Sequence, residues 1–217
     1  MNFELARFNM VAQQLRPWNL HDEEVLERFT VVRREDFVPE GWRSLAFADI
    51  EIPLPGGASM LAPKIEAHLL QALQARRHGR ALLVGAGSGH LAALLAMHAE
   101  RVLAIEIVPE LVELARDNLA RAGIRNVSVE LGDGSQGWPA QAPYDSILIA
   151  GALPKLPKAL PGQLKVGGRL AGFVGRAPVM TLTTIHRRDE QAIERRGLLE
   201  TCVPELVHEP VDDGFVF

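Results

Sequence analysis

A segment of small and apolar residues, 81–90, constrains the fold of this chain more than any other. Its sequence is Ala-Leu-Leu-Val-Gly-Ala-Gly-Ser-Gly-His: the first four residues are typical of a buried strand, and three alternating glycines follow them. Because glycine has no Cβ, Gly85, Gly87 and Gly89 can adopt a positive φ and bring backbone N–H groups close to a ligand. The segment predicts a strand, a ligand-binding turn and the start of a helix, in that order.

A second strand with a terminal carboxylate follows. Residues 102–106, Val-Leu-Ala-Ile-Glu, form an apolar run that predicts the next parallel strand, and Glu106 lies where this strand should end. A carboxylate at this place can accept hydrogen bonds from both hydroxyl groups of a ribose. The two segments together predict a nucleoside-binding site.

The glycine spacing discriminates between nucleoside cofactors. A dinucleotide-binding turn has the pattern G-x-G-x-x-G, which requires glycine at position 90, and His90 is present instead. We associate the G-x-G-x-G form with enzymes that bind S-adenosylmethionine, a cofactor without a pyrophosphate to place on the helix N-terminus. S-adenosylmethionine is therefore the predicted cofactor. The alternatives are NAD and a turn that only packs the strand against the helix.

A third polar turn, Gly132-Asp-Gly134, follows another predicted strand. The two glycines let Asp133 approach a flat ring closely, so that its carboxylate or a neighbouring N–H group can address adenine. An Asp-Gly turn without a ligand is the alternative. Since ligands of open α/β sheets bind beyond the carboxyl ends of the strands, we expect the glycine turn, Glu106, Asp133 and the segment after Ala150 to lie together.

Strand and helix patterns alternate through the middle of the chain, which predicts a parallel sheet with helices on both faces. The expected strands are near 80–84, 101–106, 126–131 and 144–150, and the expected helices are near 89–97 and 109–122. After Pro154 no long helical pattern follows, and we expect an antiparallel extension of the sheet. Its strands are expected at 169–174, 180–187 and 196–203.

The first part of the chain is predicted to be helical and then irregular. Residues 2–15 predict a helix whose apolar face comprises Leu5, Phe8, Val11 and Leu15. A second helix follows, with Asn19 as its cap. Residues 37–63 contain closely spaced prolines and glycines and predict loops, which often line binding sites. Pro63 begins a further helix that we expect Gly79 to end.

These elements form one predicted domain, 1–217, with three parts. Residues 1–78 are a helical and loop-rich cap, residues 79–160 are the cofactor-binding βα core, and residues 161–217 are a C-terminal β extension. The last residues, 212–217, are expected to fray.

Charge and cysteine content exclude several classes of function. The formal net charge is −4, the isoelectric point is near 6.0, and no block rich in Lys or Arg is present, so a nucleic-acid partner is not expected. A single cysteine, Cys202, excludes an internal disulfide and fits a reducing cytoplasm. No apolar run approaches transmembrane length and the N-terminus is charged, so we expect a cytoplasmic, unprocessed protein without a membrane partner. A monomer is favoured.

The histidines do not predict a metal site. All seven are scattered without the spacing of metal ligands. Most are expected to have surface or packing roles. His90 is the exception, because it directly follows the glycine turn and can face the ligand.

With these residues assembled, the whole chain resembles the protein-L-isoaspartate O-methyltransferases. The resemblance includes the glycine turn at 85–89 and Gly132-Asp-Gly134 and is not confined to them. Its other segments are Asn9-Met-Val-Ala-Gln-Gln-Leu-Arg16, Val32-Arg-Arg-Glu-Asp-Phe-Val-Pro39, Ala46-Phe-Ala-Asp49 with Ile52-Pro-Leu54, and Gln163-Leu-Lys-Val-Gly-Gly-Arg-Leu170.

The resemblance implies a fold, an activity and a set of site residues. The fold is a Rossmann-like methyltransferase sheet, mostly parallel, with an N-terminal helical cap and antiparallel C-terminal strands. The activity is S-adenosylmethionine-dependent transfer of a methyl group to a carboxylate of damaged, isoaspartyl protein or peptide. The cofactor-binding residues expected are Gly85, Ala86, Gly87, Ser88, Gly89, Glu106, Ile107, Gly132, Asp133 and Gly134.

The chain departs from the family pattern on the acceptor side. The family signature G-Q-T-I-S aligns with Gly57-Ala-Ser-Met-Leu, so that Leu61 replaces the serine regarded as the active-site residue. Ser59 retains a hydroxyl at the threonine position and is the candidate catalytic residue. Val84 and His90 stand where the family has an acidic residue and a tyrosine.

These departures leave the methyl acceptor open. A carboxylate is ionised at neutral pH, so its methylation needs alignment rather than a general base, and Leu61 is compatible with a slow isoaspartyl enzyme. An apolar side chain beside the methyl group is equally compatible with a different, less polar acceptor, including a small molecule. A module that binds the cofactor without turnover is the third hypothesis.

Overall fold

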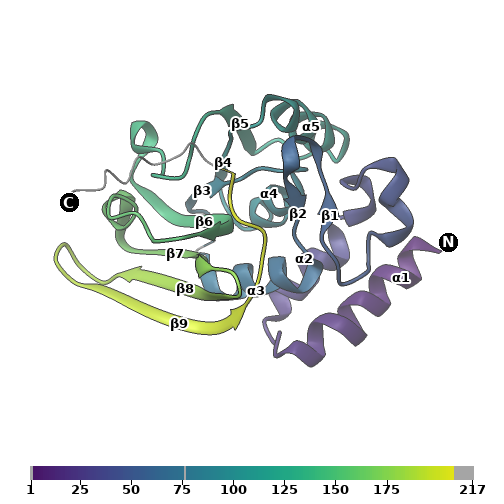
Figure 1. Cartoon of the computed structure of the whole chain (residues 1–217), viewed down its shortest axis with the longest axis horizontal. Helices are drawn as coiled ribbons and strands as arrows, with labels where there is room; N and C mark the ends of the chain where they lie inside the picture. The colour runs from purple at the N-terminus through teal and green to yellow at the C-terminus, as the bar shows by residue number, and fades with distance from the viewer. Residues whose placement is uncertain (1, 76, 208–217) are drawn as a thin grey trace.

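The computed structural model describes residues 2–75 and 77–207, which form a seven-stranded sheet flanked by helices (Figure 1). The strand order is β5-β4-β3-β6-β7-β8-β9. The strands are β3 (Arg80–Val84), β4 (Arg101–Glu106), β5 (Val127–Leu131), β6 (Tyr144–Leu153), β7 (Leu164–Arg176), β8 (Val179–Arg187) and β9 (Ile193–Thr201). Residues 212–217, which were expected to fray, lie outside the described residues.

The parallel half of the sheet has the strands that the sequence predicts. β3 pairs in parallel with both β4 and β6, and β4 pairs in parallel with β5. Leu82, Leu83, Ile147 and Leu148 are fully buried, because strands inside a covered sheet lose water from both faces. The prediction that these are central strands is confirmed.

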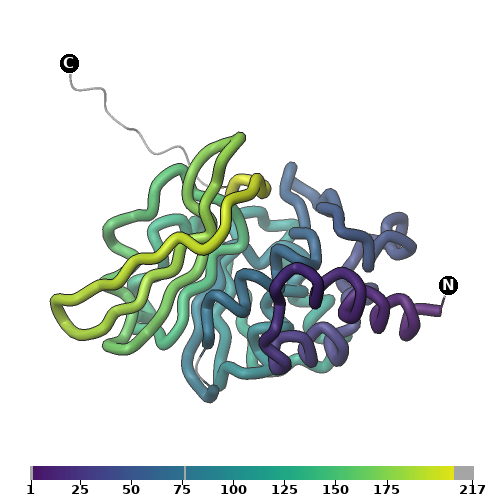
Figure 2. Tube along the Cα trace, turned by 90° about the horizontal axis from the view of Figure 1, so that it is seen from below, coloured from purple at the N-terminus to yellow at the C-terminus, as the bar shows by residue number. Residues whose placement is uncertain are grey.

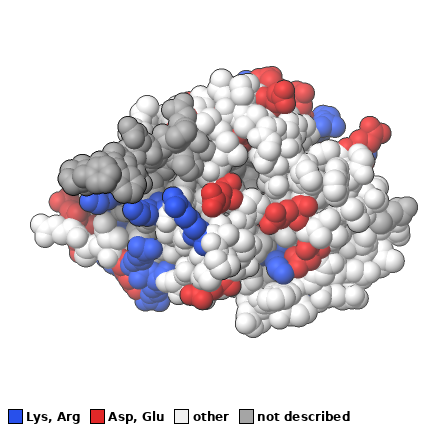
Figure 3. Space-filling view, in the orientation of Figure 1, with Lys and Arg blue, Asp and Glu red and all other residues white. Residues whose placement is uncertain are grey.

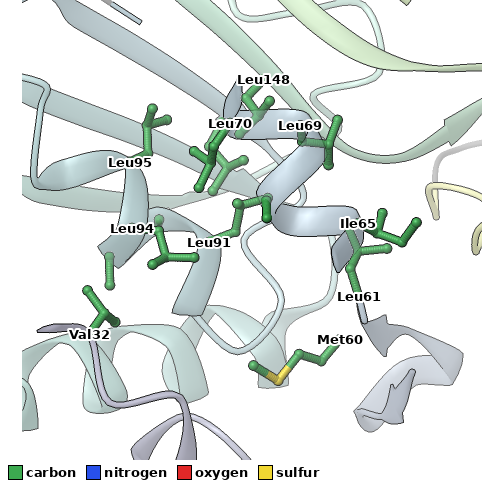
Figure 4. Packing of buried hydrophobic residues seen from close by; sticks show 14 of the residues in the cluster. Val32, Met60, Leu61, Ile65, Leu69, Leu70, Leu91, Leu94, Leu95 and Leu148 are labelled. Carbon is green, nitrogen blue, oxygen red and sulfur yellow. The ribbon is translucent and has the colours of Figure 1, made fainter. Parts of the chain in front are cut away.

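The α-helices that pack directly on the parallel strands cover one face of the sheet, whereas helices on both faces were predicted. They are α3 (Pro63–Leu73), α4 (His90–Ala96) and α5 (Pro109–Arg121). Leucines of α3 and α4 pack there against Leu148 of β6 (Figure 4). The hydrophobic cluster on the other face of the sheet, around Leu82 and Ile147, packs against residues of two irregular connections. Trp138 and Ala142 lie in the β5–β6 connection, and Leu156 lies in the β6–β7 connection. Both connections contain several prolines, which prevent an α-helix from forming.

The N-terminal cap differs from the prediction in two details. Its helices are α1 (Phe3–Asn9), a π-helix (Met10–Leu15) and α2 (Glu23–Val31). Asp22 caps α2 by accepting from two backbone N–H groups, whereas Asn19 has a left-handed conformation, φ 59°, before the helix. Of the expected apolar face, Val11 and Leu15 are buried, whereas Leu5 and Phe8 are more than half exposed.

Helix α3 ends earlier than expected. It stops at Leu73, because Gln74 adopts a left-handed conformation and its N–H group bonds the Leu70 carbonyl group, as in a helix C-cap. The preceding loop region holds only short elements, as predicted. Its strands β1 (Ile52–Pro53) and β2 (Ser59–Met60) form a small antiparallel hairpin.

The C-terminal strands extend the sheet at one edge. β8 and β9 are antiparallel to their neighbours, as the pattern after Pro154 predicts, whereas β7, expected to belong to the antiparallel extension, pairs in parallel with β6. The β8–β9 hairpin lies at the end of the molecule opposite α1 (Figures 1 and 2). After β9 the chain returns to β6, where Ala152 donates to the Pro204 carbonyl group and accepts from the Leu206 N–H group, both at 2.9 Å.

Charge is unevenly distributed on the face shown in Figure 3. Most of the Lys and Arg side chains visible there gather at the side where the β8–β9 hairpin lies in Figure 1, and acidic side chains are spread over the whole face. None of the helices within 2–75 and 77–207 is long and apolar enough to span a membrane.

The turn before α4 generates a stability prediction. Gly89 has φ 88°, and a Cβ there would lie 3.2 Å from the backbone oxygen of Ala115 in α5. Gly123 also has positive φ, 73°, after the end of α5, with open space around it. We expect Gly123→Ala to lower the free energy of unfolding by about 1 kcal/mol, from backbone conformation alone. Gly89→Ala should cost about 2–3 kcal/mol, because α5 must also shift.

Urea unfolding of both variants measures the difference. Equal losses for the two substitutions would contradict the close packing of the glycine turn on α5.

Candidate functional site

A pocket lies at the carboxyl ends of the parallel strands, where the sequence predicts it. The glycine turn after β3 forms one wall, and the residues after β4 and β5 form the next. The sequence-predicted residues that line it are Ser59, Gly85, Ala86, Gly87, Ser88, Glu106, Ile107, Gly132 and Gly134. Ala150 of β6 also lines the pocket, whereas the segment after Ala150, which was expected there, does not.

Glu106 fixes the glycine turn. Its Oε2 accepts a hydrogen bond from the Gly87 N–H group at 2.8 Å, and its Oε1 accepts from the Val108 N–H group at 3.1 Å. Gly85, Gly87 and Gly89 have φ of 87°, 52° and 88°, the left-handed region that glycine tolerates best. A carboxylate offers about four lone-pair sites, so Glu106 retains acceptor capacity toward the pocket.

Two predicted residues lie just outside the pocket lining. Gly89 is the N-cap residue of α4 and packs against α5. Asp133 lies between two lining glycines, but its Oδ1 accepts from the Ser135 N–H group at 2.7 Å. The side chain thus shapes the turn of its own loop, as Asp commonly does in an Asp-Gly sequence.

The β1–β2 hairpin and the residue after it form the facing wall. Residues 57–61 line the pocket, with Ser59 partly buried. A Cβ on Gly56 would lie 2.7 Å from Val108, so the tip of this hairpin lies against the loop that follows Glu106. Leu61 is 4% exposed and stands just before α3 (Figure 4).

A buried guanidinium supports this wall. Arg34, in a 3-10 helix (Arg34–Asp36), is fully buried and donates to the carbonyl groups of Ala46 at 2.8 Å and Leu61 at 2.7 Å. It also forms an ion pair with Glu66 of α3. Burial lowers the pKa of the Arg34 guanidinium, and the carboxylate of Glu66 opposes that effect.

His90 joins the same cluster. Its Nδ1 lies 2.8 Å from Glu66 Oε2 and 3.2 Å from Arg34 Nη1. Burial lowers the pKa of His90, although Glu66 opposes this, so the imidazole is neutral at physiological pH. Both Glu66 and His90 line the pocket. The expectation that His90 faces the ligand site is consistent with this placement.

The sequence prediction missed three contributors to the site. They are Arg34, Glu66 and the segment Pro204–Val207. This segment lines one side of the pocket and places Leu206 next to Gly85. One signal was available. Glu66 is a charged residue on the apolar face of α3, in line with Leu70 and Leu73, and such a residue needs a buried partner.

No group of three or more His, Cys, Asp or Glu within the described ranges is arranged to hold a metal ion. The polar side chains that line the pocket are the carboxylates of Glu66, Glu106 and Glu205, the hydroxyl groups of Ser59 and Ser88, and the imidazole of His90.

The family model for protein-L-isoaspartate(D-aspartate) O-methyltransferase matches residues 7–207 of the chain. The chain belongs to this family. Relatives named protein-L-isoaspartate O-methyltransferase include one from Myxococcus xanthus, 40% identical over 94% of this chain and 97% of its own. Another, from Methanoculleus marisnigri, is 39% identical over 93% of this chain and 91% of its own. The resemblance inferred from the motifs is confirmed.

A solved structure has the same fold. It is named a protein-L-isoaspartate O-methyltransferase from Plasmodium falciparum and was determined in complex with S-adenosyl-L-homocysteine. Its TM-score to this chain is 0.79 at 21% identity, over 95% of this chain and 99% of its own. The predicted fold, a methyltransferase sheet with antiparallel C-terminal strands, is thereby confirmed.

Burial of neutral His90 predicts a pH-dependent stability. The charged groups facing it are Glu66 from α3 and Arg34 and Glu35 from the 3-10 helix. Because its folded-state pKa lies below the unfolded value near 6.5, only the unfolded chain gains the proton as pH falls through about 6.5. Lowering the pH from about 7.5 to 5.5 should therefore cost about 1 kcal/mol through this residue.

Urea unfolding at both pH values tests this with His90→Gln, which removes the titrating group. The exposed His21→Gln serves as the control. The pH-dependent loss should shrink by that amount in His90→Gln alone. An unchanged loss would contradict the burial of a neutral imidazole.

Proposed function

We propose that this protein is an S-adenosylmethionine-dependent methyltransferase that esterifies the side-chain carboxylate of isoaspartyl residues in proteins or peptides. The family match across residues 7–207 carries this proposal. The pocket supports it, because its lining contains the glycine turn, Glu106 and the glycines at 132 and 134.

The lining fits the proposed cofactor. We assign the ribose hydroxyl groups to Glu106, whose carboxylate retains lone pairs, and the backbone of Gly85, Ala86, Gly87 and Ser88 to the neighbouring wall. Ile107 and the Gly132–Gly134 turn take the adenine end, with Asp133 shaping that turn. Gly89 contributes by starting α4. When bound, S-adenosylmethionine supplies a methyl group on a positively charged sulfur.

The protein's own task in this reaction is alignment. An isoaspartyl carboxylate is ionised at neutral pH, so the attacking oxygen needs no general base. Holding two reactants in line is worth effective molarities of roughly 10⁵–10⁸ M. The hairpin that carries Ser59 faces the glycine turn across the pocket, and we assign the Ser59 hydroxyl to positioning the acceptor.

One observation favours a second candidate, the same chemistry on a different acceptor. Leu61 is buried in the wall where the family pattern has a serine hydroxyl. An apolar side chain there penalises a polar acceptor group that loses its hydrogen-bond partner. A protein that only binds the cofactor is the remaining alternative.

An isoaspartyl peptide incubated with methyl-labelled S-adenosylmethionine tests the proposal. We expect labelled methyl ester, or the methanol released from it, above an enzyme-free blank. The same peptide with a normal aspartyl linkage is the control and should acquire no label. Absence of label in the isoaspartyl peptide would remove this acceptor.

Two substitutions at position 61 then measure what the missing hydroxyl costs. A well-placed polar donor is worth on the order of 10²–10³ in rate, so Leu61→Ser should raise isoaspartyl methylation by up to about that factor. Leu61→Ala creates similar space without a hydroxyl and should give no such gain. Equal rates for the two variants would show that the acceptor side has diverged beyond this residue.

A further inference from the structure

A second cavity lies between α3 and the outer strands of the sheet. Its volume is about 820 Å³, a size typical of ligand-binding cavities. α3 packs over β6, β7 and β8, and the cavity is the groove between this helix and the last strand, β9, which ends beside α3 in Figure 1. We call it the α3–β9 groove; its walls include Lys64 and Gln71 of α3 and Arg196, Leu199 and Thr201 of β9.

Strand register decides which side chains face this groove. Arg196 pairs with Thr184, and Arg195 pairs with Ile185. Thr184 lies two residues from Leu182, which belongs to the core on the α3 side, whereas Ile185 belongs to the core on the other side of the sheet. Because paired residues project from the same face of a sheet, Arg196 lies on the groove face and Arg195 on the opposite face.

The groove has an excess of positive charge, although the whole chain has a net charge of −4. Four of its lining residues are Lys or Arg and two are Glu. The carboxylate of Glu194 forms ion pairs with both Arg188 and Arg196, and Lys64 pairs with Asp49 at 2.6 Å. A guanidinium has five N–H donors, so one shared carboxylate satisfies only part of the two arginines. Carboxylates brought by a ligand suit the donors that are left.

Apolar side chains lie among these charges. Trp18 and Leu198 line the groove and are 55% and 52% exposed. The ammonium group of Lys64 lies 4.4 Å from the centre of the Trp18 ring. An exposed aromatic residue together with arginines is typical of surfaces that bind polypeptides.

The groove adjoins the acceptor end of the pocket. Leu61 lines the pocket, and Lys64, three residues later, lines the groove. A second chain segment makes the same transition, from Thr201 in the groove to Pro204 in the pocket. Three residues span at most about 11 Å. An extended polypeptide with its reacting residue in the pocket can therefore reach the groove with residues about three positions away.

We propose that the α3–β9 groove binds the polypeptide that flanks the methylated residue and favours acidic side chains about three to six positions from it. The inference rests on the proposed function, because the flank belongs to its polypeptide acceptor. The groove touches neither the cofactor nor the reacting carboxylate. Its contacts are the same before and during methyl transfer, so they should change KM and leave kcat unchanged.

Methylation kinetics of four isoaspartyl peptides test this inference. Two peptides carry either Glu or Gln at the third to sixth positions before the isoaspartyl residue, and two carry them at the same positions after it. At low ionic strength, one Glu peptide should have a lower KM than its Gln counterpart, with a similar kcat. High salt should reduce this preference, because it screens exposed charges.

Arg196→Gln then connects the preference with the groove. An exposed ion pair is worth a factor of about 2–5, so this substitution should raise the KM of the preferred Glu peptide by about that factor. The KM of the Gln peptides and all kcat values should stay the same. Arg195→Gln is the matched control, because it removes the same charge from the opposite face of β9. It should behave like the wild-type protein with all four peptides.

Four results would overturn the inference. Equal KM values for Glu and Gln peptides in both pairs would remove it and leave the proposed function intact. An equal rise of KM in both variants would show that net charge, and not the groove, selects the peptide. A wild-type dimer that Arg196→Gln dissociates would show that a second copy of the chain occupies the groove. No methylation of any isoaspartyl peptide would remove the proposed function together with the inference.

Discussion

The buried guanidinium of Arg34 is the interaction on which the acceptor side of the pocket depends. A buried charge is tolerable only when it is paired and fully hydrogen-bonded, so the chain must bring partners to it. The partners come from the Ala46 and Leu61 carbonyl groups and from Glu66 of α3. The loop region between α2 and α3 has no long element of its own, and this side chain ties it to the core.

The two ends of the pocket are built by different means. At one end, a local device suffices: Glu106 at the end of β4 holds the Gly87 N–H group of the neighbouring strand's turn. The parallel pairing of β3 and β4 places the two groups side by side. Any chain with the same short motifs can therefore form this contact. At the other end, Leu61 and His90 depart from the family pattern, and side chains from α3, α4 and the cap converge. The cofactor end of the pocket therefore keeps the family pattern, and the departures from it lie at the acceptor end.

This contrast also explains how much the sequence could predict. Strands, the glycine turn and Glu106 are encoded by local patterns, so their places were predicted correctly. The contact of His90 with Glu66 joins positions in two helices and depends on tertiary packing, which periodicity does not report. Helices were expected on both faces because the alternation of patterns does not distinguish an α-helical connection from a proline-rich one. Leu5 and Phe8 fit a helical stripe, yet the cap buries only the end of that helix nearest the core.

Titration of S-adenosylhomocysteine into the protein and into Glu106→Ala tests the central claim most directly, with the exposed Glu110→Ala of α5 as the control. Hydrogen bonds to a charged group are worth about 1.5–3 kcal/mol, so Glu106→Ala should weaken binding by roughly 10–100-fold. Glu110→Ala should bind like the wild-type protein. Equal affinity of all three proteins, or no binding by the wild-type protein, would contradict a cofactor site at the ends of β3 and β4.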